Sequence, residues 1–234
     1  MTERRTGSAV IAAIFGCVIL IGLGIWQLHR LEWKEALIAD LNARLAAPPV
    51  SLSESIDHPA EFLHVHASGT FAHQGEIFVL DSQGGIPGWR VVTPLRSDDG
   101  IFVLVDRGFV ADEQRDPSRR PGSQPEGHVE VSGYVSRHPG GQGLFTPDND
   151  AAKNNWYWWD VPAMLAFGKV DPRSRVAPFI LHALPGNDAA VVPRPSSPVL
   201  GMSNKHLQYA LTWFGLAIVL AAVAFFYVRS ERNP

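Results

Sequence analysis

The stretch SAVIAAIFGCVILIGLGIWQL, residues 8–28, decides the fold class of this chain because it contains no charged side chain. A second uncharged stretch, LQYALTWFGLAIVLAAVAFFYV, occupies residues 207–228. An α-helix of this length is roughly 32 Å long, and the hydrocarbon core of a bilayer is about 30 Å thick. Because a backbone in lipid must satisfy its own hydrogen bonds, transmembrane helices are predicted at residues 8–28 and 206–228.

A cleaved signal peptide is the rival interpretation of the first stretch. Its apolar run, residues 9–25, is longer than the roughly 7–15 residues of the apolar core of a signal peptide, and no A-x-A-like cleavage site follows it. Arg4 and Arg5 lack the polar and apolar surroundings of a twin-arginine signal. We therefore interpret the stretch as a retained membrane helix.

The orientation follows from the two tails, residues 1–7 and 229–234. Each tail carries two arginines and one glutamate, whereas residues 29–205 contain 16 Lys and Arg against 21 Asp and Glu. Positively charged short segments stay on the cytoplasmic side of a membrane. Both tails are thus predicted to be cytoplasmic, with the intervening residues exported, and these suffice for one domain.

The compartment is predicted from cysteine usage and from the N-terminal region. The single cysteine, Cys17, lies inside the first helix, so the exported part has neither a disulfide nor a thiolate metal site. Only seven residues precede that helix, so we expect no presequence for mitochondrial import. These features favour a bacterial inner membrane with a periplasmic domain. The near-neutral charge balance gives no reason to expect a nucleic-acid partner.

Between the membrane helices the hydrophobic period changes from helical to alternating. Residues 29–47 continue the first helix as a juxtamembrane helix that stops at Ala47-Pro48-Pro49. Residues 48–205 are predicted to form a mainly antiparallel β domain, a small barrel or a sandwich, with a short helix at 161–167 and loops at 112–127 and 184–198. Strands are expected at 62–72, 75–82, 89–97, 101–110, 128–136 and 177–184. The fold class is a membrane protein of α+β type.

Several motifs of the exported domain admit a functional interpretation beside a structural one. His64 and His66 share one face of a strand and, with His73, would offer metal ligands, but half-buried strand histidines are more common. DRG at 106–108 is expected to form a local salt bridge and a tight turn. NNWYWWD at 154–160 would serve as a stacking platform, a partner contact, a membrane-surface belt or a core cluster. Hydrolase and phosphate-binding signatures are absent from the sequence, so no enzyme is predicted.

Both tails are predicted to be cytoplasmic. The end of the first membrane helix and the start of the second are therefore expected at the same, exported face of the membrane. Residues at helical spacing there form two aromatic and polar stripes, Trp26, Arg30 and Trp33 on the first helix and His206, Tyr209 and Trp213 on the second. Interfacial anchoring explains the tryptophans and Arg30 well, but it explains His206 less well. Imidazole is a usual axial ligand of haem iron, and Arg30 would pair with haem propionates.

Seven motifs in a fixed order resemble the surfeit locus protein 1 family, whose members are membrane assembly factors for cytochrome c oxidase. The resemblance covers nearly the whole chain and includes the two terminal helices. The motifs are GIWQLHRLEWK (24–34), SGTF (68–71), PGWRVVTPL (87–95), VLVDRGFV (103–110), VEVSGYV (129–135), NNWYWWD (154–160) and HLQYALTWFGLA (206–217). This chain departs from the family pattern at Asp106, which is usually Asn, and at Phe109, which is usually Trp.

The resemblance implies the function of the bacterial members of the family. It implies that haem a is bound transiently with His206 as the axial ligand of the iron, and that the haem is placed in subunit I of the oxidase. Haem a synthase is implied as a further partner. Trp26, Arg30, Tyr209 and Trp213 would line the site, although Tyr209 and Trp213 also suit an interfacial belt. The alternative is a membrane scaffold that stabilises an oxidase assembly intermediate without binding haem.

Overall fold

The computed structural model describes residues 2–137, 139–186, 192–198 and 204–232. The chain divides into a helical unit, residues 1–40 and 201–234, and a domain, residues 41–200. Some predicted segments include residues outside the described ranges: the two tails, the loop at 184–198 and the C-terminal end of the domain, which was predicted at 205.

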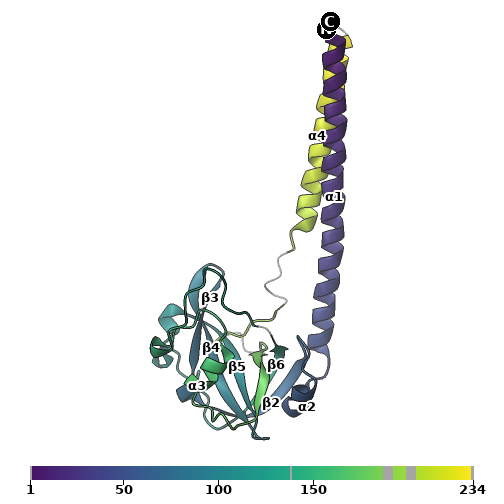
Figure 1. Ribbon diagram of the computed structural model, residues 1–234. Coiled ribbons are helices and arrows are strands. Elements are labelled where there is room, and N and C mark those ends of the chain that lie inside the picture. The colour runs from purple at the N-terminus through teal and green to yellow at the C-terminus, as the bar shows by residue number, and fades with distance from the viewer. Residues whose placement is uncertain (1, 138, 187–191, 199–203, 233–234) are drawn as a thin grey trace. The chain divides into compact units, whose positions relative to one another are not determined.

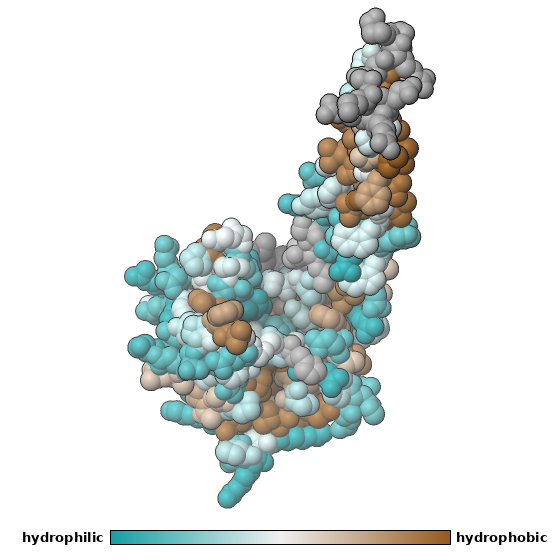
Figure 2. Space-filling model, turned by 45° about the horizontal axis from the view of Figure 1, so that its top comes forward, coloured by the Kyte–Doolittle hydropathy of each residue, from teal (hydrophilic) through white to brown (hydrophobic). Residues whose placement is uncertain are grey.

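The helical unit contains α4, His206–Arg232, and α1, Thr2–Ala46, except for the last turns of α1, which belong to the domain. Both helices are long and apolar enough to cross a membrane, and apolar side chains dominate the part of their surface seen in Figure 2. One continuous helix covers the predicted membrane segment 8–28 and all but the last residue of the predicted juxtamembrane helix 29–47. It ends before Pro48, as predicted, because proline removes a backbone donor and restricts the preceding residue. The boundaries of the lipid-embedded segments stay predictions.

Small residues let α1 and α4 pack closely side by side and antiparallel, as Figure 1 shows. A Cβ added at Gly24 would lie 2.5 Å from Cε1 of Phe214, so glycine leaves the space that the phenylalanine ring fills. The Cys17 thiol donates a hydrogen bond to the carbonyl of Ala217, with Sγ 3.6 Å from the oxygen. Close backbone approach through small residues is a common way to pair helices in lipid, where the hydrophobic effect does not drive association.

The domain is a seven-stranded sheet that closes on itself (Figure 1). The strand order is β1-β2-β6-β7-β5-β4-β3, and β2 pairs with β4 as well as with β6. The strands are β1 Val50–Ser51, β2 His64–Phe71, β3 Ile77–Gln83, β4 Ile86–Ser97, β5 Phe102–Ala111, β6 His128–Ser136 and β7 Val176–Ala183. Five of them, β2, β6, β7, β5 and β4, therefore form a barrel, and all pairings except β1–β2 and β5–β7 are antiparallel. Each predicted strand is confirmed.

The alternation of strand side chains builds two apolar layers. Val103 and Val105 of β5 belong to a cluster with residues of β2, β4, β6 and β7, whereas Leu104 belongs to a second cluster with Trp156. The short helix α3, Val161–Phe167, contributes Met164 to this second cluster and has the predicted bounds. β5 is thus apolar on both faces and contributes to both clusters.

Two features of the domain have no counterpart in the sequence-based prediction. One is the short segment of β1 and α2, Leu52–Asp57, which packs Leu52 against the first cluster. The other is the tight anchoring of the segment 112–127, which composition alone classes as a loop. Arg120 in this segment is buried and pairs with Glu76, which also pairs with Arg107. The segment is thus attached to the barrel by buried charges.

Barrel closure predicts a steric effect at Gly69, which pairs with Ser97 where β2 meets β4. A Cβ at Gly69 would lie 2.1 Å from the carbonyl oxygen of Arg96. Overpacking of this kind costs about 1–3 kcal/mol, so Gly69→Ala should lower the free energy of unfolding by that amount. The measurement is chemical denaturation of the full chain in detergent. Gly141→Ala is the control, since nothing lies within 4 Å of its Cβ position; equal stability of both variants would contradict the prediction.

Candidate functional site

His206, the first residue of α4, faces Gln27 of α1 within the helical unit. Its Nδ1 lies 2.8 Å from Oε1 of Gln27. An amide oxygen only accepts hydrogen bonds, so Nδ1 of His206 is the donor and carries the ring proton. Among the described residues, no hydrogen bond engages Nε2 of His206. Within the described part of the chain, the half-buried imidazole thus has one nitrogen without a hydrogen bond.

The register of the two helices places Trp26 beside Tyr209. The helices are antiparallel, with His206 opposite Gln27 and Ala217 opposite Cys17. In this register Trp26 and Tyr209 lie at nearly the same level along the helix pair. With about 100° of rotation per residue, both side chains project to the same flank of the pair. They are 56% and 53% exposed. Two aromatic side chains thus stand on one flank next to the His206–Gln27 contact.

The other predicted residues of the stripes lie close to this flank. The Arg30 guanidinium is stacked over the ring of Trp33, 4.1 Å from its centroid. Trp213 is half-buried and, by the same helical rotation, turns toward α1. The structure thus pairs His206 with Gln27 and Arg30 with Trp33 in the region where we expected a site. Their role in binding a ligand stays a prediction.

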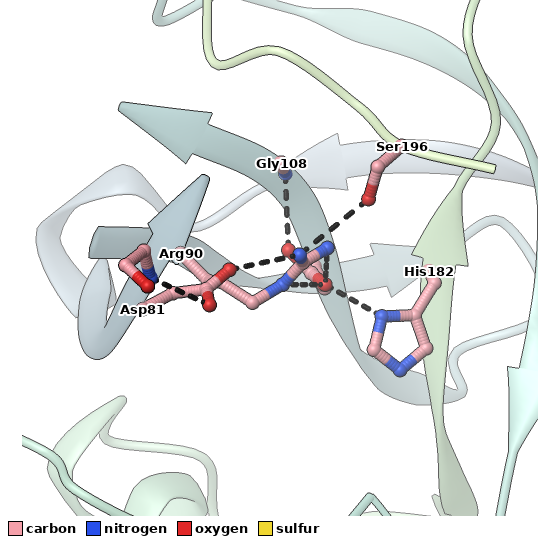
Figure 3. Close-up of polar contacts among 7 residues, drawn as sticks. Asp81, Arg90, Gly108, His182 and Ser196 are labelled. Atoms are coloured by element: carbon pink, nitrogen blue, oxygen red, sulfur yellow. Dashed lines mark hydrogen bonds and ion pairs between the residues drawn. The ribbon is translucent and has the colours of Figure 1, made fainter. Parts of the chain in front are cut away.

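A buried charged cluster in the domain was not anticipated from the sequence. The carboxylate of Asp106 on β5 is fully buried. It accepts hydrogen bonds from Nε of Arg90 at 2.6 Å, from Nδ1 of His182 at 2.5 Å and from the backbone N–H of Gly108 at 3.0 Å. Arg90 also pairs with Asp81 at 3.3 Å (Figure 3). The cluster joins β3, β4, β5 and β7.

The opposite charges in this cluster determine the protonation state of Asp106. Burial alone would raise the pKa of this carboxyl, but the neighbouring Arg90 and His182 outweigh it and lower the pKa to about 2. Tyr134 stacks on His182 with ring centroids 5.0 Å apart. Its burial and the nearby Asp106 raise the pKa of Tyr134 to about 12. Asp106 is therefore a carboxylate and Tyr134 a neutral phenol at neutral pH.

The DRG motif forms a bulge and a cross-sheet cluster. We expected a tight turn at 106–108, but β5 runs through these residues, and the register against β4 shifts by one residue at Arg107. The salt bridge extends across the sheet to Arg90 and is not local. The sequence signal for the cluster is a charged or polar residue inside each of three apolar strands: Arg90 in GWRVV, Asp106 in VLVDRGFV and His182 in FILHAL.

The NNWYWWD segment is largely part of the core. Trp156 is fully buried, and its indole N–H donates to Oδ1 of Asn154 at 3.0 Å. Trp159 packs edge-on against His182, with centroids 5.7 Å apart. Asp160 caps α3 by accepting from the N–H of Ala163. Of the four interpretations of this motif, its contacts favour the core cluster.

The strand histidines have structural partners. Both ring nitrogens of His64 are within hydrogen-bonding distance of a partner, the carbonyl of Ala47 at 2.8 Å and the Ser132 hydroxyl at 2.7 Å. His73 lies 2.9 Å through Nε2 from the carbonyl of Pro125. Over the described ranges, no group of three or more His, Cys, Asp or Glu side chains is placed to hold a metal ion.

The lowered pKa of Asp106 predicts a component of acid sensitivity. Its value of about 2 in the folded state lies below the roughly 3.9 of an unfolded chain, so the stabilisation is present above pH 4 and is lost as the pH falls toward 2. This component is worth about 2 kcal/mol. Asp106→Asn should therefore lose less stability than the wild type between pH 5 and pH 2.5.

The measurement is the free energy of unfolding of the full chain at a series of pH values. Asp99→Asn, in the exposed turn between β4 and β5, serves as the control and should follow the wild-type profile. Parallel acid profiles for Asp106→Asn and the wild type would show that Asp106 does not carry the effect.

The matches to known protein families extend over most of the chain. The family model described as the SURF1 family matches residues 14–218. A SURF1-like protein of Monosiga brevicollis is 34% identical over 99% of this chain and 92% of its own length. Surfeit locus protein 1 of Homo sapiens is 32% identical over 86% of this chain and 71% of its own. A SURF1-like protein of Drosophila melanogaster is 34% identical over 91% of this chain and 75% of its own length.

Proposed function

The chain belongs to the SURF1 family, and from this premise we propose that it is an assembly factor for a haem–copper oxidase that binds haem a through His206. The resemblance to oxidase assembly factors supplies the biological role, and the His206–Gln27 contact supplies the physical basis for the ligand. Haem a is cargo in this proposal, and cytochrome c oxidase subunit I is the recipient. The protein acts as a chaperone and has no turnover of its own.

The observation that carries the proposal is the state of the His206 ring. An axial imidazole must be neutral at the coordinating nitrogen and must present a lone pair. Nδ1 of His206 donates to Gln27, so the lone pair lies on Nε2. A single protein ligand of this kind would hold the haem and still allow exchange into subunit I. Haem a synthase is the proposed donor of the cargo.

The residues around His206 fit a porphyrin. Trp26 and Tyr209 offer exposed aromatic surface on one flank of the helix pair, which suits the faces and edges of a macrocycle. Arg30 carries a guanidinium on the same flank, where it would pair with a propionate. We therefore assign haem-contacting roles to these three residues and to Trp213.

The proposal is tested by substituting His206. Wild-type protein purified from cells that make haem a should show the optical spectrum of bound haem a. His206→Ala should lose most of the haem or show a shifted spectrum, because the iron loses its axial ligand. His29→Ala is a matched control, since His29 is an exposed histidine of α1 that pairs with Glu32. A colourless wild type, or an unchanged spectrum in His206→Ala, would refute the assignment.

A haem-independent scaffold is the second candidate, and one observation favours it. Leu144 and Phe145 are 92% and 94% exposed in the segment between β6 and α3. Neighbouring exposed apolar side chains are typical of a protein–protein contact, and subunit I is the proposed partner. The optical experiment separates the candidates, because a scaffold would support oxidase assembly while remaining colourless.

We further propose a bacterial inner membrane location with both termini in the cytoplasm and the domain in the periplasm. A Cys17→Ser background removes the single native thiol and keeps a donor for Ala217. In this background, Asp99→Cys should react with a membrane-impermeant maleimide in intact cells, whereas Ser230→Cys should react only after lysis. Both positions are exposed. The reverse labelling pattern would invert the topology.

A further inference from the structure

We propose that Gln27 is the positioning residue of His206: its amide oxygen holds the imidazole in the tautomer that presents Nε2 as a ligand. This inference rests on the proposed function for its purpose, since the choice of tautomer matters when iron is to be bound. The geometry that carries it is the 2.8 Å contact between Nδ1 of His206 and Oε1 of Gln27.

The chemistry of the contact decides which nitrogen is free. A neutral imidazole has one N–H donor and one acceptor nitrogen, and the partner of one nitrogen sets the role of the other. Because Oε1 of Gln27 accepts, the proton stays on Nδ1 and the Nε2 lone pair is available. Metal-binding histidines are held in this way by a carbonyl or carboxylate on the second nitrogen.

The packing of the helices keeps Gln27 and His206 opposite each other. Gly24 lies about one turn before Gln27 and admits the ring of Phe214. Ala210 lies one turn after His206 and is buried. Small residues on both helices thus bring the two backbones together near this level. The hydrogen bond forms between side chains whose helices are already held in register, which orients the ring and limits its rotation.

The variants separate positioning from packing. Gln27→Leu removes the acceptor and keeps a side chain of similar size, so the tautomer should no longer be fixed. Gln27→Glu keeps an oxygen that accepts from Nδ1–H, so the tautomer should be retained. Gln208→Leu is the matched control, because Gln208 is an exposed glutamine on α4 two residues from His206.

The direct readout is the protonation of the His206 ring without any haem. The full chain, labelled with ¹⁵N-histidine in detergent micelles, is studied by NMR at a pH where the ring is neutral, and the His206 signals are identified by their loss in His206→Ala. The wild type, Gln27→Glu and Gln208→Leu should show a protonated Nδ1 and an unprotonated Nε2. Gln27→Leu should show the Nε2–H form in substantial proportion. A wild type with Nε2–H, or an unchanged Gln27→Leu, would overturn the inference.

A second readout measures haem a binding. Loss of the group that orients a metal ligand typically weakens binding roughly 10–100-fold, which is the loss expected for Gln27→Leu. Gln27→Glu should retain binding and give a lower midpoint potential, because a carboxylate makes the imidazole a stronger donor. A purely structural role for Gln27 would not distinguish these variants in this way.

The two readouts also separate this inference from the proposed function. A wild type that stays colourless but shows the predicted tautomer change would remove the haem function and support the positioning role. A wild type that binds haem through His206, with tautomer and affinity unchanged in Gln27→Leu, would support the function and overturn the positioning role.

Discussion

A buried carboxylate that requires cations imposes the strongest constraint on the domain. Asp106 is fully buried on β5, where an unpaired charge would be prohibitively costly, and Arg90 and His182 reach it from the strands on either side. Asp81 in turn pairs with Arg90. Because the partners come from β3, β4 and β7, the cluster is complete only when these strands are in register with β5. It therefore specifies a single strand arrangement.

The motifs shared with the SURF1 family divide between the two units according to their physical roles. Within the domain, SGTF provides the close approach that closes the barrel, PGWR and VDRG build the charged cluster, and NNWYWWD supplies the core tryptophan under α3. The helical motifs leave an imidazole and several aromatic side chains incompletely buried. Side chains of the domain motifs mostly pack against and hydrogen-bond to one another, whereas those of the helix pair retain exposed surface for a ligand.

Much of the fold follows from the sequence, because local patterns carry it. Two uncharged stretches predicted the helices, alternation predicted the strands, and proline at 48 predicted the end of α1. The second pairing of β2 with β4 was not predictable, since it joins strands that are distant in the chain and leaves no periodic signal. The parallel β5–β7 pairing was missed for the same reason.

The sequence by itself determined which residues could form a site: a histidine opening one apolar helix, and an arginine among tryptophans leaving the other. Only the tertiary structure decided that Gln27 is the partner of His206, because the two are 179 positions apart and meet through antiparallel helix packing. It also showed that Asp106, an apparent turn residue, is the centre of a buried ion cluster. Local propensity depends on neighbours in the chain, whereas the partners of a buried polar group are set by contacts between distant segments.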